Sequence, residues 1–170
     1  MEVDDAGGWL EGLSPDEVLS RKGDGVNMFI EPRTGLDVLD RQECLRLLGR
    51  CDLGRIAVVV NGRPLVFPVN FTLDNDAIVL RTDDGTKLHG ARNGHVAFEC
   101  DGTDRVYHTG WSVLASGEAE EVTNVSEVAH LERLRLGTWC PGPSPIWLRI
   151  RPKMLTGRRI PPYGPARTQP

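Results

Sequence analysis

The pair Asn61-Gly62 constrains the fold of this chain more than any other short segment. It separates a β-branched apolar run, residues 55–60, from a second extended segment, residues 63–71. Asn-Gly is the strongest short signal for a β-hairpin, because both residues tolerate the positive φ angles of a two-residue turn. The chain is therefore expected to build its core from antiparallel strands joined by short turns.

Hydrophobic patterning predicts further strands after this hairpin region. Apolar or alternating segments occur at residues 77–81, 95–100, 111–122, 146–150 and 154–160. Capping signals at Ser14, Asp40 and Asn124 predict short helices, the last running to about Gly137, and residues 87–92 are expected to form one helical turn. Strands joined by short turns in one domain predict a mainly β protein, an antiparallel barrel with a few peripheral α-helices.

Composition bounds the domain organisation and the partners. The chain has 170 residues, of which 39% are apolar, and this is enough for one domain with a real core. We expect an N-terminal extension over residues 1–35, partly flexible, a barrel domain over 36–160 and a proline-rich tail over 161–170. The net charge of −4 argues against a nucleic-acid partner. There is no apolar run of membrane-spanning length, and the acidic start lacks the features of a signal peptide, so a cytoplasmic protein with no membrane partner is predicted.

Cysteine and histidine spacing predicts no metal site. The four cysteines are Cys44, Cys51, Cys100 and Cys140, and the four histidines are equally scattered, without a CxxC or HExxH pair. Free thiols in a reducing compartment are expected. We also expect the cysteines to be dispensable for binding a cofactor.

The segment that follows the strand predicted at residues 77–81 has the chemistry of an anion site. Arg81 and Lys87 flank a turn that contains Gly85 and the hydroxyls of Thr82 and Thr86. Two cationic side chains, hydroxyl donors and exposed backbone N–H groups are what a phosphate requires. Turns are also rich in these residue types for reasons of solvation alone, so an ordinary solvated turn is the alternative interpretation of this window.

The order of the predicted elements resembles the flavin-binding split-barrel family related to pyridoxamine 5'-phosphate oxidase. Five segments carry the resemblance: Gly54-Arg55-Ile56-Ala57, the run from Pro64 to Phe71, Leu80-Arg81-Thr82 with Gly85-Thr86-Lys87-Leu88, Gly110-Trp111-Ser112-Val113 with Gly117-Glu118-Ala119, and Trp147-Leu148-Arg149-Ile150 with Thr156-Gly157-Arg158-Arg159-Ile160. Together these segments span residues 39 to 160. Their common order and spacing make the resemblance more specific than any single motif.

The resemblance implies a six-stranded antiparallel Greek-key split β-barrel that forms a homodimer with FMN in a crevice between the subunits. The residues that match phosphate contacts are Arg81, Thr82 and Lys87. The residues that match the strand bordering the flavin ring are Pro68, Val69 and Asn70. Trp111 and Ser112 match a segment that lines the same crevice, although Trp111 is equally well explained as a core aromatic residue, and Trp147 is expected to reach the flavin from the partner subunit.

One departure from the family limits the functional prediction. Pyridoxamine 5'-phosphate oxidase carries an Arg-X-His element near its C-terminus, whereas this chain has Gly157-Arg158-Arg159-Ile160 and no such histidine. The resemblance therefore supports the flavin and not that substrate. No residue is identified as catalytic, which is compatible with a flavoenzyme because the cofactor performs the hydride chemistry.

Four functions follow from these observations. The first is an FMN-dependent oxidoreductase that acts on an unknown small molecule, with a nicotinamide nucleotide as the reductant. The second is a non-catalytic flavin-binding protein, and the third is the same barrel with a deazaflavin cofactor or haem. The fourth is an interaction module that uses the N-terminal extension.

Overall fold

The structure is a computed structural model, and it describes residues 19–23, 26–92, 94–134, 136–137, 139 and 144–161. The strands are β1 (Leu19–Gly23), β2 (Val26–Ile30), β3 (Asp37–Leu39), β4 (Leu53–Val60), β5 (Arg63–Asp74), β6 (Ala77–Thr82), β7 (His95–Asp104), β8 (Thr109–Val122) and β9 (Ile146–Ile160). The helices are α1 (Arg41–Leu48), α2 (Thr86–Ala91) and α3 (Val125–Leu131), which a 3-10 turn, η2 (Glu132–Leu134), continues. The helix predicted at Ser14 and most of the predicted tail lie outside the described residues.

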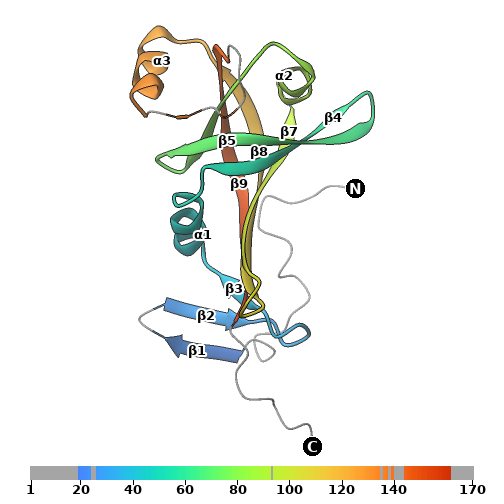
Figure 1. The fold of residues 1–170 in the computed structure, drawn as a ribbon, viewed down its shortest axis with the longest axis vertical. Coiled ribbons are helices and arrows are strands. Elements are labelled where there is room, and N and C mark those ends of the chain that lie inside the picture. The colour runs from blue at the N-terminus through green and yellow to red at the C-terminus, as the bar shows by residue number, and fades with distance from the viewer. Residues whose placement is uncertain are drawn as a thin grey trace, which may run out of the picture.

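Six antiparallel strands close into a ring in the order β4, β5, β6, β9, β8, β7, and β7 pairs again with β4 (Figure 1). The chain leaves β6 on one side of β5 and returns as β7 on the far side of β4. The connection therefore crosses the ring, and it carries α2, which contacts β4. This crossing is the Greek-key feature of the topology. The predicted fold class, a six-stranded antiparallel split barrel with peripheral helices, is confirmed.

The Asn-Gly turn forms as predicted. Asn61 and Gly62 have φ angles of 50° and 73°, and Val60 pairs directly with Arg63 across the turn. This two-residue turn matches the right-handed twist of the flanking strands. It sets the register of β4 against β5, and so decides which side chains of both strands face the core.

The barrel core is built from alternate residues of these strands. Phe71 and Phe98 meet edge to face inside the ring, with ring centroids 4.7 Å apart. A second, smaller cluster lies between α3 and the sheet, where Leu131 packs with Val79 and Trp147. Helix α1 begins as predicted, because the Asp40 side chain accepts a hydrogen bond from the Glu43 N–H at 2.8 Å.

Two predicted boundaries are wrong. The sequence predicts separate closing strands at 146–150 and 154–160, but β9 is continuous, and a register shift opposite Ser116 and Gly117 lets the strand pass Pro152 without ending. The helix that begins after Asn124 ends at Leu131 and tightens into η2, well before Gly137. Local periodicity predicts neither the continuity of β9 nor the end of α3. Pairing with a distant strand decides the continuity of β9, and packing of the short helix decides where α3 ends.

The expected N-terminal extension contains strands that the sequence pattern does not predict. Strands β1 and β2 form a hairpin, β2 pairs with β3, and β3 pairs with the C-terminal part of β9. These strands extend the sheet at the end of the molecule opposite α2 and α3 (Figure 1). The barrel is therefore continuous with a second, open sheet region.

An ionic contact joins α1 to β9. The Glu43 carboxylate accepts two hydrogen bonds from Arg46, each 2.6 Å long, and also contacts Arg159 of β9. The hydrogen bonds from Arg46, reinforced by those from Arg159, lower the pKa of Glu43 from 4.5 to about 2. The side chain of Glu43 is 13% exposed, whereas those of its partners Arg46 and Arg159 are 43% and 28% exposed.

We expect Glu43→Gln to lower the free energy of unfolding at pH 7 by about 2 kcal/mol, since it removes charge-assisted hydrogen bonds. Because the folded-state pKa lies below the unfolded one, this stabilisation is present above pH 4.5 and is lost as the pH falls toward 2. Denaturant unfolding at pH 7 and pH 3 measures both effects. The control is Glu118→Gln, which alters an exposed ion pair with Lys153 and should change stability less. A loss for Glu43→Gln that is the same at both pH values would contradict the assignment.

Candidate functional site

Strands β5 and β6 diverge at one end of their ladder. They pair only from Phe71–Leu80 to Asp74–Ala77. Before Phe71, β5 pairs with β4 alone, and after Leu80, β6 pairs with β9 alone. We call this divergence the strand fork. It places Asn70 and Arg81, two of the predicted site residues, just beyond the last β5–β6 pair.

Two contacts orient the Arg81 side chain at the fork. Its Nε donates a hydrogen bond to the main-chain oxygen of Ser144 at 2.8 Å, and its guanidinium carbon lies 5.3 Å from the ring centroid of Trp147. A guanidinium group has five N–H donors, so these contacts orient the group and leave its terminal nitrogens able to bind an anion. Arg81 therefore has the geometry of a preorganised anion contact.

Two neighbours of Arg81 are buried in their own protomer. Trp147 is 2% exposed and packs in the cluster beneath α3, where its ring supports the Arg81 guanidinium. Thr82 is 1% exposed, and its hydroxyl donates to the main-chain oxygen of Asp83 at 3.2 Å. This geometry favours a supporting role for Trp147 rather than a reach toward a neighbouring subunit. The predicted contacts of both residues with the cofactor remain predictions.

Lys87 lies in the first turn of α2 and is half-buried. Across the part of the chain that the structure describes, its ammonium group has no hydrogen-bond or ion-pair partner. Two exposed carboxylates, Asp83 and Asp84, occupy the turn between the fork and the helix. An anion at this turn would therefore have to be held by Arg81 and Lys87 against the repulsion of these acids.

Asn70 links the fork to two distant segments. Its Oδ1 accepts a hydrogen bond from the Trp139 N–H at 2.8 Å, and its Nδ2 donates to the main-chain oxygen of Asp52 at 3.0 Å. The side-chain amide is therefore engaged within the chain. The main-chain edge of β5 that faces β6 remains open before Phe71, because β6 does not pair with β5 there.

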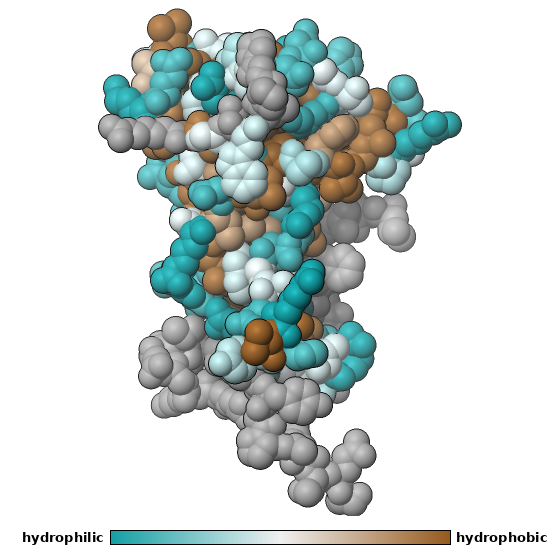
Figure 2. Space-filling view, in the orientation of Figure 1, coloured by the Kyte–Doolittle hydropathy of each residue, from teal (hydrophilic) through white to brown (hydrophobic). Residues whose placement is uncertain are grey.

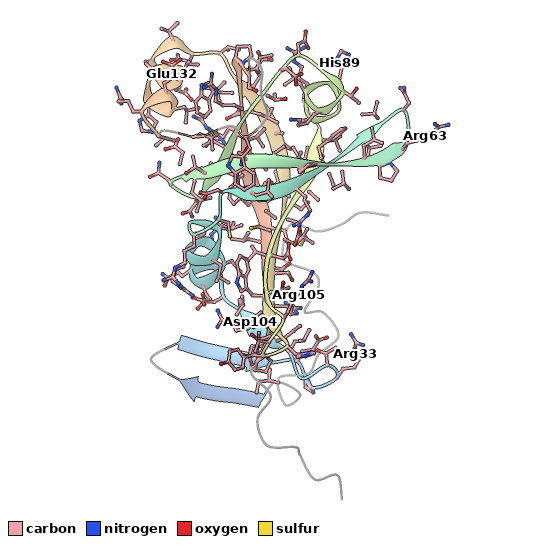
Figure 3. The ribbon with its side chains drawn as sticks, viewed as in Figure 1. Arg33, Arg63, His89, Asp104, Arg105 and Glu132 are labelled. Atoms are coloured by element: carbon pink, nitrogen blue, oxygen red, sulfur yellow. The ribbon has the colours of Figure 1, made fainter. Side chains whose placement is uncertain are left out.

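Trp111 and Ser112 lie far from the strand fork along the sheet. Ser112 pairs with Arg158 of β9, whereas Arg81 pairs with Trp147, so the two positions are eleven residues apart on β9. This separation is roughly 35 Å of extended strand. Figure 3 shows the same elongation, with His89 of α2 near one end and Asp104 and Arg105 of the β7–β8 turn toward the other. One protomer therefore does not bring all the predicted site residues together.

The indole of Trp111 is packed rather than free. It is half-buried and lies against Gly102 of β7, so closely that a Cβ atom at position 102 would come within 2.7 Å of the indole Nε1. Ser112, the next residue on β8, is exposed between Asp101 and Arg158. The structure thus supports the packing interpretation of Trp111 and leaves Ser112 accessible from outside.

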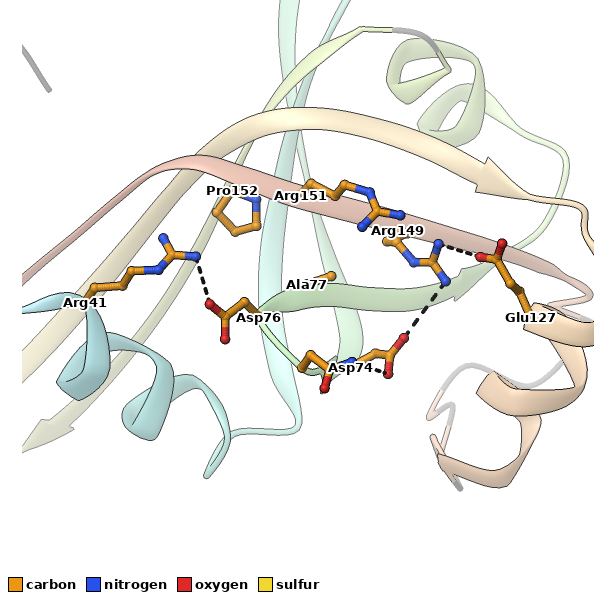
Figure 4. Close-up of a pocket in the computed structure, with 9 residues that line it drawn as sticks. Arg41, Asp74, Asp76, Ala77, Glu127, Arg149, Arg151 and Pro152 are labelled. Carbon is orange, nitrogen blue, oxygen red and sulfur yellow. Dashed lines mark hydrogen bonds and ion pairs between the residues drawn. The ribbon is translucent and has the colours of Figure 1, made fainter. Parts of the chain in front are cut away.

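A separate pocket of about 510 Å³ opens where the β5–β6 turn faces β9 (Figure 4). Its lining residues are Arg41, Asp74, Asn75, Asp76, Ala77, Glu127, Arg149, Arg151 and Pro152. The buried Arg149 binds Glu127 at 2.6 Å, and Arg41 binds Asp76 at 3.1 Å. The charged residues of the pocket all take part in ion pairs, some with one another and some with neighbours outside the lining such as Glu120, and none of the predicted site residues lines it.

Two contacts at the fork are not detectable from the sequence. Ser144 and Trp139 both belong to the connection between η2 and β9, more than sixty residues from their partners Arg81 and Asn70. Both use main-chain atoms, so their side chains carry no signal of the contact. Trp139 is 68% exposed, which makes it an accessible aromatic residue beside the fork.

The fold and the fork define a split-barrel protein with a candidate anion site. Residues 40–159 match the family model described as pyridoxamine 5'-phosphate oxidase, and the chain belongs to this family. None of the helices that the structure describes is long and apolar enough to cross a membrane.

The chain is similar to proteins from Mycobacterium and Corynebacterium species. An uncharacterized protein of Mycobacterium tuberculosis is 34% identical over 128 residues, which cover 72% of this chain and 84% of the relative. The solved structure of an FAD binding protein from Mycobacterium smegmatis is 36% identical, with a TM-score of 0.63 over 72% of this chain and 96% of that one. A conserved protein of unknown function from Corynebacterium diphtheriae is 30% identical, with a TM-score of 0.62 over the same two shares.

The Asn70 contacts generate a test of the fork geometry. Asn70→Ala should accelerate amide hydrogen exchange at Trp139 about fivefold or more, since loss of one hydrogen bond costs about 1 kcal/mol. Asn70→Asp keeps an acceptor oxygen and should leave this amide protected. Exchange followed by NMR separates the two variants, and equal exchange rates would show that the Asn70 oxygen does not hold Trp139.

Proposed function

We propose that this protein binds FMN and acts as an FMN-dependent oxidoreductase on a small molecule. The observation that carries the proposal is a pair of cations around the end of β6, with Arg81 at the strand fork and Lys87 in the first turn of α2. Arg81 is oriented by Ser144 and Trp147 while its terminal nitrogens stay available, and Lys87 is unpaired among the described residues. A phosphate is the ligand group that such a pair recognises.

The donors at the fork fit the riboflavin 5'-phosphate unit that FMN and FAD share. Arg81 and Lys87 would hold the phosphate, and Thr82 would contribute less because its hydroxyl is engaged with Asp83. The open edge of β5 offers the main-chain N–H and carbonyl of Asn70 and the carbonyl of Pro68 to the polar edge of the flavin ring, because Val69, like Phe71, directs its main-chain groups toward β4. When bound, the flavin supplies the hydride chemistry, and the protein binds and orients it.

The likeness to a solved FAD binding protein favours FAD as a second candidate cofactor. Purified protein should carry a flavin that absorption and mass spectrometry identify after release. FMN is the expected result, and FAD would replace it within the same site. A haem or deazaflavin spectrum would overturn the proposal. Anaerobic reduction by a nicotinamide nucleotide, followed by turnover of an acceptor, separates an oxidoreductase from a non-catalytic flavin carrier.

Lys87→Ala should weaken FMN binding about tenfold or more, because charge-assisted contacts contribute about 1.5–3 kcal/mol each. Riboflavin lacks the phosphate and should bind both proteins equally. Fluorescence titration of the apoprotein with each flavin measures the two affinities. The control is His89→Ala, which changes an exposed residue of the same helix. Equal weakening of FMN and riboflavin by Lys87→Ala would show that Lys87 does not bind the phosphate.

We further propose that the working unit is a homodimer with the flavin between the subunits. The separation of Ser112 from Arg81 along β9 supports this, because two-fold pairing can bring the β8 segment of one protomer to the fork of its partner. An exposed apolar surface is available for such pairing. Val59 of β4 and Val66 of β5 form it, because Val59 pairs with Pro64 and Val66 with Ala57 on the same face of the β4–β5 hairpin, near its tip (Figure 2).

Val66→Asp should convert the dimer to a monomer and weaken flavin binding with it, since each protomer would bury a carboxylate without a partner. The matched control is Val106→Asp, which changes an equally apolar, exposed residue at the tip of the β7–β8 hairpin. Light scattering measures the mass of the protein in solution. Flavin titration at several protein concentrations shows whether flavin affinity depends on dimer formation. A wild-type mass of one 18.8 kDa chain with flavin fully bound would rule out the shared site.

A further inference from the structure

Trp139 and Ser144, which both lie between η2 and β9, are attached to opposite strands of the fork. On the β5 side, the Trp139 N–H donates a hydrogen bond to Asn70 Oδ1 at 2.8 Å. On the β6 side, the main-chain oxygen of Ser144 accepts a hydrogen bond from Arg81 Nε at 2.8 Å. Main-chain atoms of the η2–β9 connection therefore border the fork on both of its strands.

The main chain of Trp139 is held in place, but its indole is not packed. Leu136, three residues earlier, packs against the cluster beneath α3, and the hydrogen bond to Asn70 holds the Trp139 N–H. Of the tryptophans that the structure describes, Trp147 is 2% exposed and Trp111 is half-buried, whereas Trp139 is 68% exposed. Tryptophan side chains are highly buried on average, so an exposed indole on an attached main chain is an apolar surface available to a ligand.

The fork beside this indole carries polar groups along one edge. The main-chain N–H and carbonyl of Asn70 face the open edge of β5, and the Arg81 guanidinium lies across the fork on β6. The Trp139 indole lies within side-chain reach of this edge, because its own N–H is bound to Asn70. An apolar aromatic face next to a row of donors and acceptors is suited to a planar heteroaromatic ring with a polar edge.

We propose that the Trp139 indole stacks on the isoalloxazine ring of the flavin and helps to position it against β5. This inference rests on the proposed function for the identity of the ring. It assigns different parts of one ligand to different residues of the site. Arg81 and Lys87 bind the phosphate, whereas Trp139 acts on the ring and should contribute equally to flavins with and without a phosphate.

The first test is fluorescence titration of the apoprotein with FMN and with riboflavin. Trp139→Ala should weaken both flavins by the same factor, about tenfold, which is within the range that aromatic stacking of a base contributes. Trp139→Phe retains a ring and should keep most of the affinity. Both substitutions leave the main-chain N–H that binds Asn70. The control is Val125→Ala, which changes an 84% exposed apolar residue of α3 and should bind both flavins like the wild type.

The emission of the bound flavin gives a second readout that a merely structural role would not change. A stacked indole donates an electron to the excited flavin and quenches its emission, whereas a phenylalanine ring does not. Flavin bound to Trp139→Phe should therefore emit more strongly than flavin bound to the wild type or to Val125→Ala.

The outcomes separate this inference from the proposed function. A wild-type protein that binds no flavin would overturn both. A wild-type protein that binds flavin, with unchanged affinities in Trp139→Ala or unchanged emission in Trp139→Phe, would overturn the stacking alone. Weakening of FMN without weakening of riboflavin in Trp139→Ala would also overturn it, because the residue would then act on the phosphate.

Discussion

The pairing of β9 with three other strands is the constraint on which the rest of this structure depends. Its first residues pair with β6, nearly its whole length pairs with β8, and its last residues pair with β3. The first two pairings close the barrel, and the third attaches the N-terminal strands. Closure removes the free edges that an open sheet would expose. A register error in β9 would therefore disturb the barrel, the fork and the outer sheet together.

The strand fork follows directly from this closure. Strand β6 must leave β5 in order to follow β9, while β5 must leave β6 in order to follow β4. The divergence exposes main-chain groups of β5 and places Arg81 where its partners come from a distant connection. The candidate site therefore arises where β5 and β6 stop pairing. Binding residues are often found where regular structure ends. Ser112 and Arg81 pair with distant parts of β9, and this separation is the reason for the proposal that a second protomer completes the cofactor site.

Much of the fold was predictable because local physics decides it. The Asn61-Gly62 turn, the Asp40 cap and the alternation of β8 each depend on neighbours in the sequence, and each forms as predicted. The predicted end of the third helix and the break in β9 were wrong because packing and long-range pairing override local preference there. Strands β1 and β2 were missed because the pattern around them is weak.

The sequence alone determined the class of barrel and the residue types of the candidate site, since hydrophobic period, turn chemistry and the order of motifs are local properties. It placed an arginine and a lysine around one turn, and both remain near the end of β6. Only the tertiary structure decided that the Trp147 ring supports the Arg81 guanidinium and that Asn70 is engaged within the chain. These contacts join residues separated by dozens of positions, and only strand register and ring closure bring such residues together.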